Sequence, residues 1–154
     1  MVSGEVCVDR AKTALSSYLA AQLIIETSLV AGAVAAPVPY GYFFGDRSIE
    51  QLDGFPAISI SAINSPIKDS QYHYDEISHT IQIIAWVVEV DPETLHRFVL
   101  RYANAIREVL RDESKWGNEL HSPSIVQTQY SEVYNADHGL AQACRVQVEI
   151  KEVR

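Results

Sequence analysis

The stretch ISHTIQIIAWVVEVDPETLHRFVLRYANAIREVL, Ile77 to Leu110, decides the fold, because a strand pattern passes directly into a helix pattern there. Up to Val90 both alternating faces are apolar, one of them carrying Ile81 and Ile83 and the other carrying Ile84 and Trp86. A strand that is apolar on both faces is typical of the centre of a sheet. The stretch from Ile77 to Val90 is therefore predicted to be a central strand, covered on both sides over part of its length.

The second half of the stretch carries a helix start signal. Asp91 can accept a hydrogen bond from the first free N–H groups, Pro92 fits the first helical position, and Glu93 suits the positive end of the helix dipole. Apolar side chains then recur every three or four residues, which predicts a helix over 92–113 that packs one face on the sheet. These are Leu95, Phe98, Val99, Tyr102, Ile106, Val109 and Leu110.

Strand patterns lie on both sides of this stretch. The run 55–63 alternates isoleucine with serine, and the polar segment 64–76 joins it to the central strand, which predicts a long β-hairpin arm within 55–90. After the helix, strands from about Ser124 to Tyr134 and from about Leu140 to Val153 are joined by a turn, which predicts a C-terminal hairpin over 124–153. We expect an α+β fold with one domain over 1–154.

The front of the chain is predicted to be a helix over 9–30, with Asp9 as its cap, followed by a long loop or short irregular strand over 32–54. One helical face carries Leu15, Tyr18, Leu19, Ile25 and Leu29. The apolar run 14–36 contains a small-residue motif like a signal-peptide cleavage site, but serines, a glutamine and a glutamate interrupt it. We therefore expect a packing helix here and neither a leader nor a membrane span.

Composition narrows the function classes. The 154 residues are 47% hydrophobic and 21% charged, as is ordinary for a globular protein, and the formal net charge of −8 disfavours a protein that grips nucleic acid. The two cysteines, Cys7 and Cys144, lie far apart and have no metal-binding spacing, which indicates reduced thiols in a cytoplasmic setting. The sequence has no G-x-S-x-G motif, no Walker loop and no G-x-G-x-x-G motif.

Two clusters of polar residues could carry chemistry. His73, Asp75 and His79 would share one face of an extended segment, with Glu76 beside them, so a metal site is one reading; a polar hairpin arm with His79 flanking the core is the other. Asp137-His138 could act as an acid and base pair, but it lies in a predicted turn that demands such residues for backbone reasons. Both clusters favour the structural reading.

Four arginines are expected on the exposed side of the 92–113 helix: Arg97, Arg101, Arg107 and Arg111. They form either a solvated face, with a pair between Glu93 and Arg97, or a surface complementary to an acidic neighbouring subunit. Tyrosines of the arm and of the later hairpin are either interface anchors or cross-strand packing partners.

The order of these patterns resembles the tail terminator and tail completion proteins of long-tailed bacteriophages. The resemblance runs from about Asp9 to Val153 and rests on a helix, a loop, the FPAISI strand, a long arm, the SHTIQIIAWV strand, the DPETL helix ending in IREVLRD, and the closing GLAQACRVQVEI hairpin. It implies two helices on one face of a mainly antiparallel four- to five-stranded sheet. It also implies a structural virion protein of the tail or neck, with no catalysis and no cofactor or bound metal.

The resemblance further implies a ring, typically hexameric, that terminates the tail tube and joins it to the head connector. Its partners would be other copies of itself, the tail tube protein and the head-tail connector protein. DNA would pass through the lumen without specific binding, and no membrane would be involved. The protein would be found in the host cytoplasm during assembly and then in the virion. The alternative is a small ferredoxin-like enzyme or a metal- or ligand-binding domain that uses the cluster from His73 to His79.

If the chain forms such a ring, we expect the loop 32–54 and the arm 64–76 to contact neighbours. The predicted subunit or partner interface comprises Tyr42, Phe43, Tyr72, His73, Tyr74, Arg97, Arg101, Tyr134, Asp137 and His138.

Overall fold

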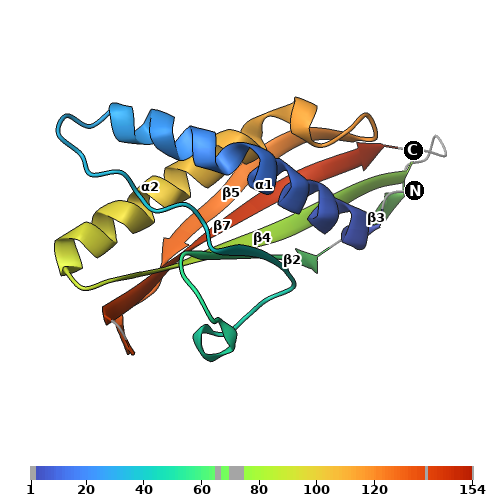
Figure 1. Cartoon of the computed structure of the whole chain (residues 1–154). Coiled ribbons are helices and arrows are strands. Elements are labelled where there is room, and N and C mark those ends of the chain that lie inside the picture. The colour runs from blue at the N-terminus through green and yellow to red at the C-terminus, as the bar shows by residue number, and fades with distance from the viewer. Residues whose placement is uncertain (1–2, 65–66, 70–74, 138, 154) are drawn as a thin grey trace.

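A computed structural model describes residues 3–64, 67–69, 75–137 and 139–153. It contains two long helices, α1 (Gly4–Ser28) and α2 (Pro92–Arg111), and two short 3-10 helices, η1 (Ile49–Gln51) and η2 (Glu113–Lys115). The strands are β1 (Gly41–Phe44), β2 (Ala57–Asn64), β3 (Ile67–Asp69), β4 (Asp75–Glu89), β5 (Leu120–Tyr130), β6 (Tyr134–Ala136) and β7 (Gly139–Val153). Figure 1 shows their arrangement.

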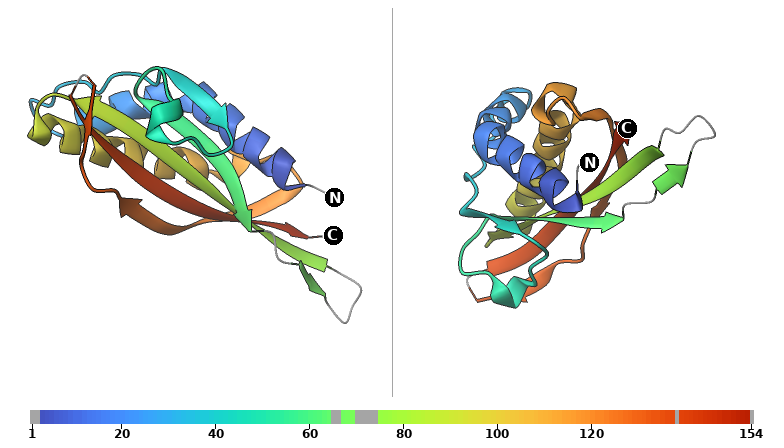
Figure 2. Two further views of the ribbon diagram at one scale, coloured as in Figure 1. Left: turned by 90° about the horizontal axis from the view of Figure 1, so that it is seen from below. Right: turned by 90° about the vertical axis from the view of Figure 1, so that its right-hand side faces the viewer.

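The sheet follows the order β1-β2-β4-β7-β5, with β3 paired to β4 and β6 paired to β7. Among the described residues the β1–β2 pair is parallel, and the other five strand pairs are antiparallel. Both long helices cover the same face of this sheet, and neither lies on the opposite face (Figure 2). The predicted α+β class, with two helices on one face of a mainly antiparallel sheet, is confirmed.

β4 is the central strand that its sequence predicts. It lies between β2 and β7, and its alternation puts Ile81 and Ile83 in the core under the helices. Ile84 is buried on the other face, where Trp86 is partly exposed. β3 pairs with the first residues of β4, which confirms a hairpin arm; its residues 65–66 and 70–74 lie outside the described part of the chain.

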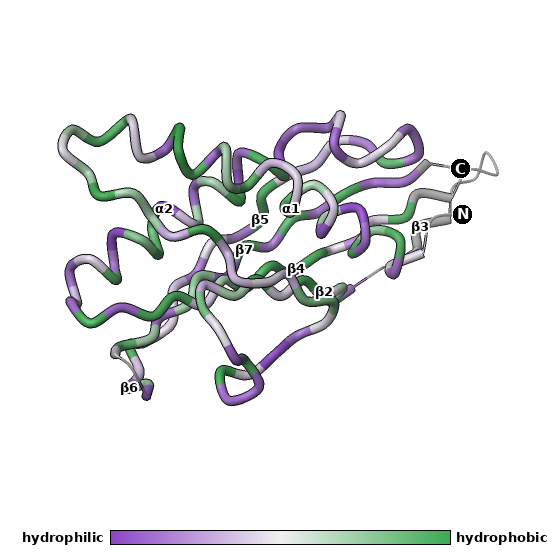
Figure 3. The backbone as a smooth tube through the Cα atoms, in the orientation of Figure 1, coloured by the Kyte–Doolittle hydropathy of each residue, from purple (hydrophilic) through white to green (hydrophobic). Residues whose placement is uncertain are grey.

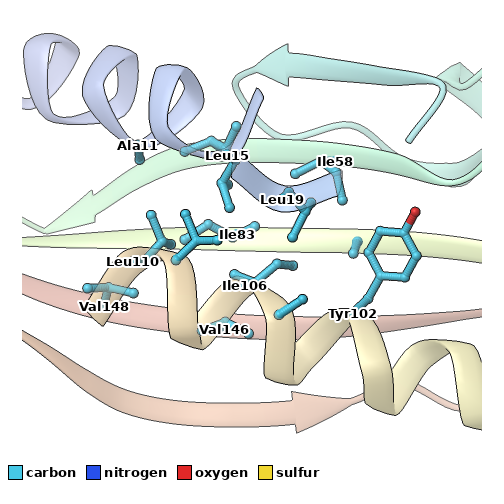
Figure 4. Packing of buried hydrophobic residues seen from close by; sticks show 14 of the residues in the cluster. Ala11, Leu15, Leu19, Ile58, Ile83, Tyr102, Ile106, Leu110, Val146 and Val148 are labelled. Carbon is cyan, nitrogen blue, oxygen red and sulfur yellow. The ribbon is translucent and has the colours of Figure 1, made fainter. Parts of the chain in front are cut away.

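α2 also forms as predicted. The Thr94 N–H donates to Oδ2 of Asp91 at 3.0 Å, so Asp91 caps the helix, and Pro92 is its first residue. The predicted apolar face is buried throughout and meets the core residues of β4 and β7 (Figure 4). The buried Trp116 closes the end of α2, because its indole N–H donates to the Leu110 carbonyl at 2.9 Å.

α1 differs from the prediction in where it starts. The helix begins at Gly4, capped by Ser3, whose Oγ accepts a hydrogen bond from the Val6 N–H at 3.2 Å. The prediction that Asp9 caps this helix is therefore wrong: Asp9 lies one and a half turns inside it.

The face by which α1 packs also differs from the prediction. Leu15 and Leu19 are buried as predicted, but Tyr18, Ile25 and Leu29 are exposed. The buried stripe instead begins at Cys7 and passes through small residues, among them Ala11, which let α1 approach α2 and β2 closely (Figure 4). The second half of α1 consequently presents apolar side chains that nothing in the described chain covers.

The segment that follows α1 is held against α2 by two long side chains. The Arg101 guanidinium donates to the carbonyl oxygen of Val34, and the Tyr102 hydroxyl donates to that of Pro37. The segment then enters β1, where the prediction allowed either a loop or a short strand. Among the described residues no helix is both long and apolar enough to cross a bilayer.

Candidate interface surfaces

The open face of the sheet carries a groove over β4 and β7. The register places Ile84 beside Arg145 and Trp86 beside Ala143, so these four side chains share the face turned away from the helices. Tyr134 of β6 adds an aromatic wall, with its ring centroid 6.0 Å from that of Trp86. The result is a hollow of about 570 Å³, which we call the basic groove and define by Arg47, Ile84, Trp86, Tyr134, Ala143 and Arg145.

The basic groove is apolar at its floor and cationic at its sides. Arg47 lies in the segment after β1 with its guanidinium carbon 5.7 Å from the centre of the Phe43 ring, and Arg145 projects from β7. Asp46 also lines the hollow, so its three charged side chains sum to one positive charge. A cationic groove is unusual on a chain whose formal net charge is −8.

A second surface is formed by apolar residues at the end of α1 and just after it. We call it the α1 apolar patch and define it by Ile24, Ile25, Leu29, Val30 and Val34. Ile24 is 72% exposed and Leu29 is 73% exposed. Figure 3 shows hydrophobic residues at this end of α1 and along the segment that follows. From Ala14 to Ala36 the sequence carries only one charged residue, Glu26, and depletion of charge is typical of the core of an interface.

A buried pair lies on the helix side of the sheet. Nε2 of His79 is 3.5 Å from Oε2 of Glu152, and both side chains are almost fully buried. Burial, with a smaller contribution from the charge of Glu152, raises the pKa of the nearby Cys7 thiol to about 11. The thiol is therefore protonated at neutral pH, which does not suit a nucleophile. His79 thus flanks the core, as the structural reading of its cluster predicts.

The alternative metal site is not tested by the structure. Of its four proposed residues, His73 lies outside the described residues, and the side chains of Asp75 and Glu76 are not described either. Within the described part of the chain, no group of three or more His, Cys, Asp or Glu residues is placed to hold a metal ion.

The predicted interface residues fall on different surfaces. Tyr42 faces the helices, where burial raises its pKa, whereas its neighbour Phe43 is on the open face beside Arg47. Tyr134 lines the basic groove, and Asp137 is exposed in the β6–β7 turn. Tyr72, His73, Tyr74 and His138 lie outside the described residues.

The two α2 arginines of the predicted interface, Arg97 and Arg101, differ in their exposure to solvent. Arg97 is exposed and pairs with Glu93 at 2.9 Å, as the spacing predicts. The prediction that Arg101 lies on the exposed side is wrong, since it is only 7% exposed. Burial, together with the charge of Arg97, lowers the pKa of Arg101, and the carbonyl of Val34, 67 positions earlier, accepts a hydrogen bond from its guanidinium. The spacing along α2 could not show that this segment crosses over Arg101.

The structure thus brings together Phe43 and Tyr134 with residues that sequence reasoning did not single out, above all Arg47 and Arg145. The sequence does indicate the position of Arg145, because the alternation of apolar and polar residues in β7 places it on the open face of the sheet. What the sequence lacked was the register that sets Arg145 beside Ile84 of β4.

Comparison with protein-family models gives no match, and no curated protein matches the chain. Among solved structures the chain is similar to one from the "Virion of native gene transfer agent (GTA) particle", at 14% identity, covering 92% of this chain and 96% of that one. The TM-score is 0.46, and at this level of similarity the match carries no argument about function.

Proposed function

We propose that this chain is a structural protein of a phage tail or neck, which assembles with copies of itself into a ring. In this role it ends the tail tube and joins it to the head connector, without catalysis. The phage role rests on the sequence resemblance described above. Self-assembly is supported by one observation on the described residues, the α1 apolar patch.

The size of the patch fits an interface. Its five residues present on the order of 500 Å², more than half of what one partner contributes to a standard protein interface. An exposed apolar patch of this size on a monomeric protein is often functional. The predicted helical face of α1 explains its origin: Ile25 and Leu29 continue an apolar periodicity that none of the described residues covers.

The proposal is tested by measuring the mass of the purified protein by size-exclusion chromatography with light scattering. A closed oligomer of 17.2 kDa subunits is expected, and a single species near 17.2 kDa at every concentration would refute self-assembly. The variants Ile24→Glu and Leu29→Glu should shift the protein toward monomer, because each places a charge in the interface.

Both variants should fold normally, since substitutions at sites this exposed change stability by about 0.5 kcal/mol or less. Val90→Glu is the matched control. Val90 is 76% exposed but lies in the turn before α2, outside the patch, so its substitution should leave the mass unchanged. If all three variants lowered the mass of the assembly equally, the effect would come from the added charge and not from the patch.

A further inference from the structure

We infer that the α1 apolar patch of one copy packs against a different apolar surface of the next copy, at the edge of the sheet formed by β5 and β6. We call this second surface the β5–β6 patch and define it by Val126, Tyr130, Val133 and Tyr134. The inference rests on the proposed ring and names the two surfaces that meet in it.

The β5–β6 patch lies along an open edge. β5 is the last strand of the sheet, and among the described residues no strand pairs with its outer side. Val126 is 55% exposed and Val133 is 51% exposed. Proteins commonly protect an open edge with charged side chains or proline, but the eight residues 124–131 contain neither. An uncharged edge with exposed apolar side chains is typical of a surface that another polypeptide covers.

The α1 apolar patch has the matching chemistry. From Thr27 to Gly45 the sequence contains no charged residue, so both patches belong to uncharged regions of a chain whose net charge is −8. Two acidic copies repel each other least where uncharged surfaces meet. A charged partner would lose hydration against either patch without gaining an opposite charge. A second copy of this chain therefore fits both surfaces.

The combined area is sufficient for a stable contact. The β5–β6 patch presents on the order of 350 Å² of apolar surface, so the two patches together present about 850 Å². Because about 56 to 65% of an interface is apolar, this area corresponds to an interface of about 1,300 to 1,500 Å² in total. Standard interfaces bury about 1,200 to 2,000 Å².

The positions of the two patches require that the contact join different copies. α1 packs on β1 and β2 near one edge of the sheet, β5 forms the other edge, and α2 lies between α1 and β5 (Figure 2). The contact is heterologous, because each patch meets a different one, and every copy keeps a patch for the next copy. A two-fold contact between two α1 apolar patches would stop at a dimer and could not build the proposed ring.

Mixing two defective variants tests the inference by sedimentation velocity. Ile24→Glu/Leu29→Glu places charges in the α1 apolar patch, and Val126→Glu/Val133→Glu places them in the β5–β6 patch. Each variant alone should sediment as a monomer of 17.2 kDa. An equimolar mixture should form a complex of two chains and nothing larger, because each variant retains the patch that the other lacks and no intact patch remains to extend the complex.

The mixture is measured well above the concentration at which the wild-type protein assembles, since a single contact lacks the added stability of a closed ring. Ile63→Glu is the matched control. Ile63 is a strand residue of β2 that is 47% exposed and belongs to neither patch, so its substitution should leave assembly unchanged.

The outcomes separate this inference from the proposed ring. If the wild-type protein assembles, three results would overturn the inference and leave the ring standing: normal assembly of Val126→Glu/Val133→Glu, a mixture that stays monomeric, or an equal loss of assembly in Ile63→Glu. A wild-type protein that stays monomeric would overturn both.

Cross-linking gives a second test that adds no charge. Both native cysteines are buried, so a bismaleimide should react with cysteines introduced at the surface. The variant Leu29→Cys/Val133→Cys should give a ladder of covalent multiples of the chain, whereas either single variant should remain uncross-linked. Covalent dimers from Leu29→Cys alone, or no ladder from the double variant while it assembles, would overturn the inference.

Discussion

The packing of α1 leads to a paired prediction, because two large apolar residues six positions apart on one helix should behave in opposite ways. Leu19 is 0% exposed and points into the core near Ile58 and Ile83 (Figure 4), whereas Ile25 is 52% exposed. We therefore compare Leu19→Ala with Ile25→Ala. Both substitutions remove a large apolar side chain from a helix and replace it with the best helix former.

Leu19→Ala should lower the free energy of unfolding by about 3 kcal/mol, within the range for Leu→Ala in a packed core, because the lost burial and the cavity add. For a chain of this length that corresponds to a fall in melting temperature of about 6 to 12 °C. Ile25→Ala should change the free energy by about 0.5 kcal/mol or less.

The assay is urea unfolding followed by circular dichroism, at a protein concentration where the chain is monomeric, so that lost association does not count as lost stability. The slope of free energy against urea should be the same for both variants and the wild type. Equal losses from the two substitutions, or a larger loss from Ile25→Ala, would refute the packing of α1 described here.

Three further predictions follow from the core and from the proposed role. Both cysteines should resist alkylation at pH 8 in the folded protein and react after unfolding, because burial raises the pKa of Cys7 to about 11 and that of Cys144 to about 12. Since unfolded thiols ionise near pH 8.5 to 9, the free energy of unfolding should fall as the pH rises from about 9 toward these values, which unfolding measured at several pH values would show. Rapid alkylation of the native protein would contradict the burial of the two thiols. Tyr102→Phe should cost about 1 kcal/mol in urea unfolding, since the Pro37 carbonyl loses its donor, whereas no loss would mean that this bond adds nothing. Dialysis against EDTA should leave the melting temperature unchanged, and a fall of several degrees would favour the alternative metal-binding function centred on His73, Asp75, Glu76 and His79.

The elements that sequence predicted well are those specified by local chemistry. Asp91 and Pro92 fix the start of α2 through neighbouring backbone groups, and the alternation of β7 depends on residues two apart. The start of α1 is also set locally, by Ser3, but the prediction placed the cap at Asp9.

The features that sequence missed depend on contacts between distant segments. β1 is four residues long and exists through parallel pairing with β2. Arg101 is buried by a segment 67 positions earlier in the chain, and His79 meets Glu152 across the β4–β7 register. The basic groove has the same origin, since no local pattern relates Arg47 to Arg145. The residues that line the basic groove therefore could not be predicted as a set from the sequence.

Negative-stain electron microscopy of the concentrated protein tests the proposed ring, because it shows the closure of the assembly as well as its size. We expect discrete closed rings of identical subunits, lost in the Ile24→Glu and Leu29→Glu variants. A field of single subunits, or of two-fold dimers that never close into rings, would contradict it.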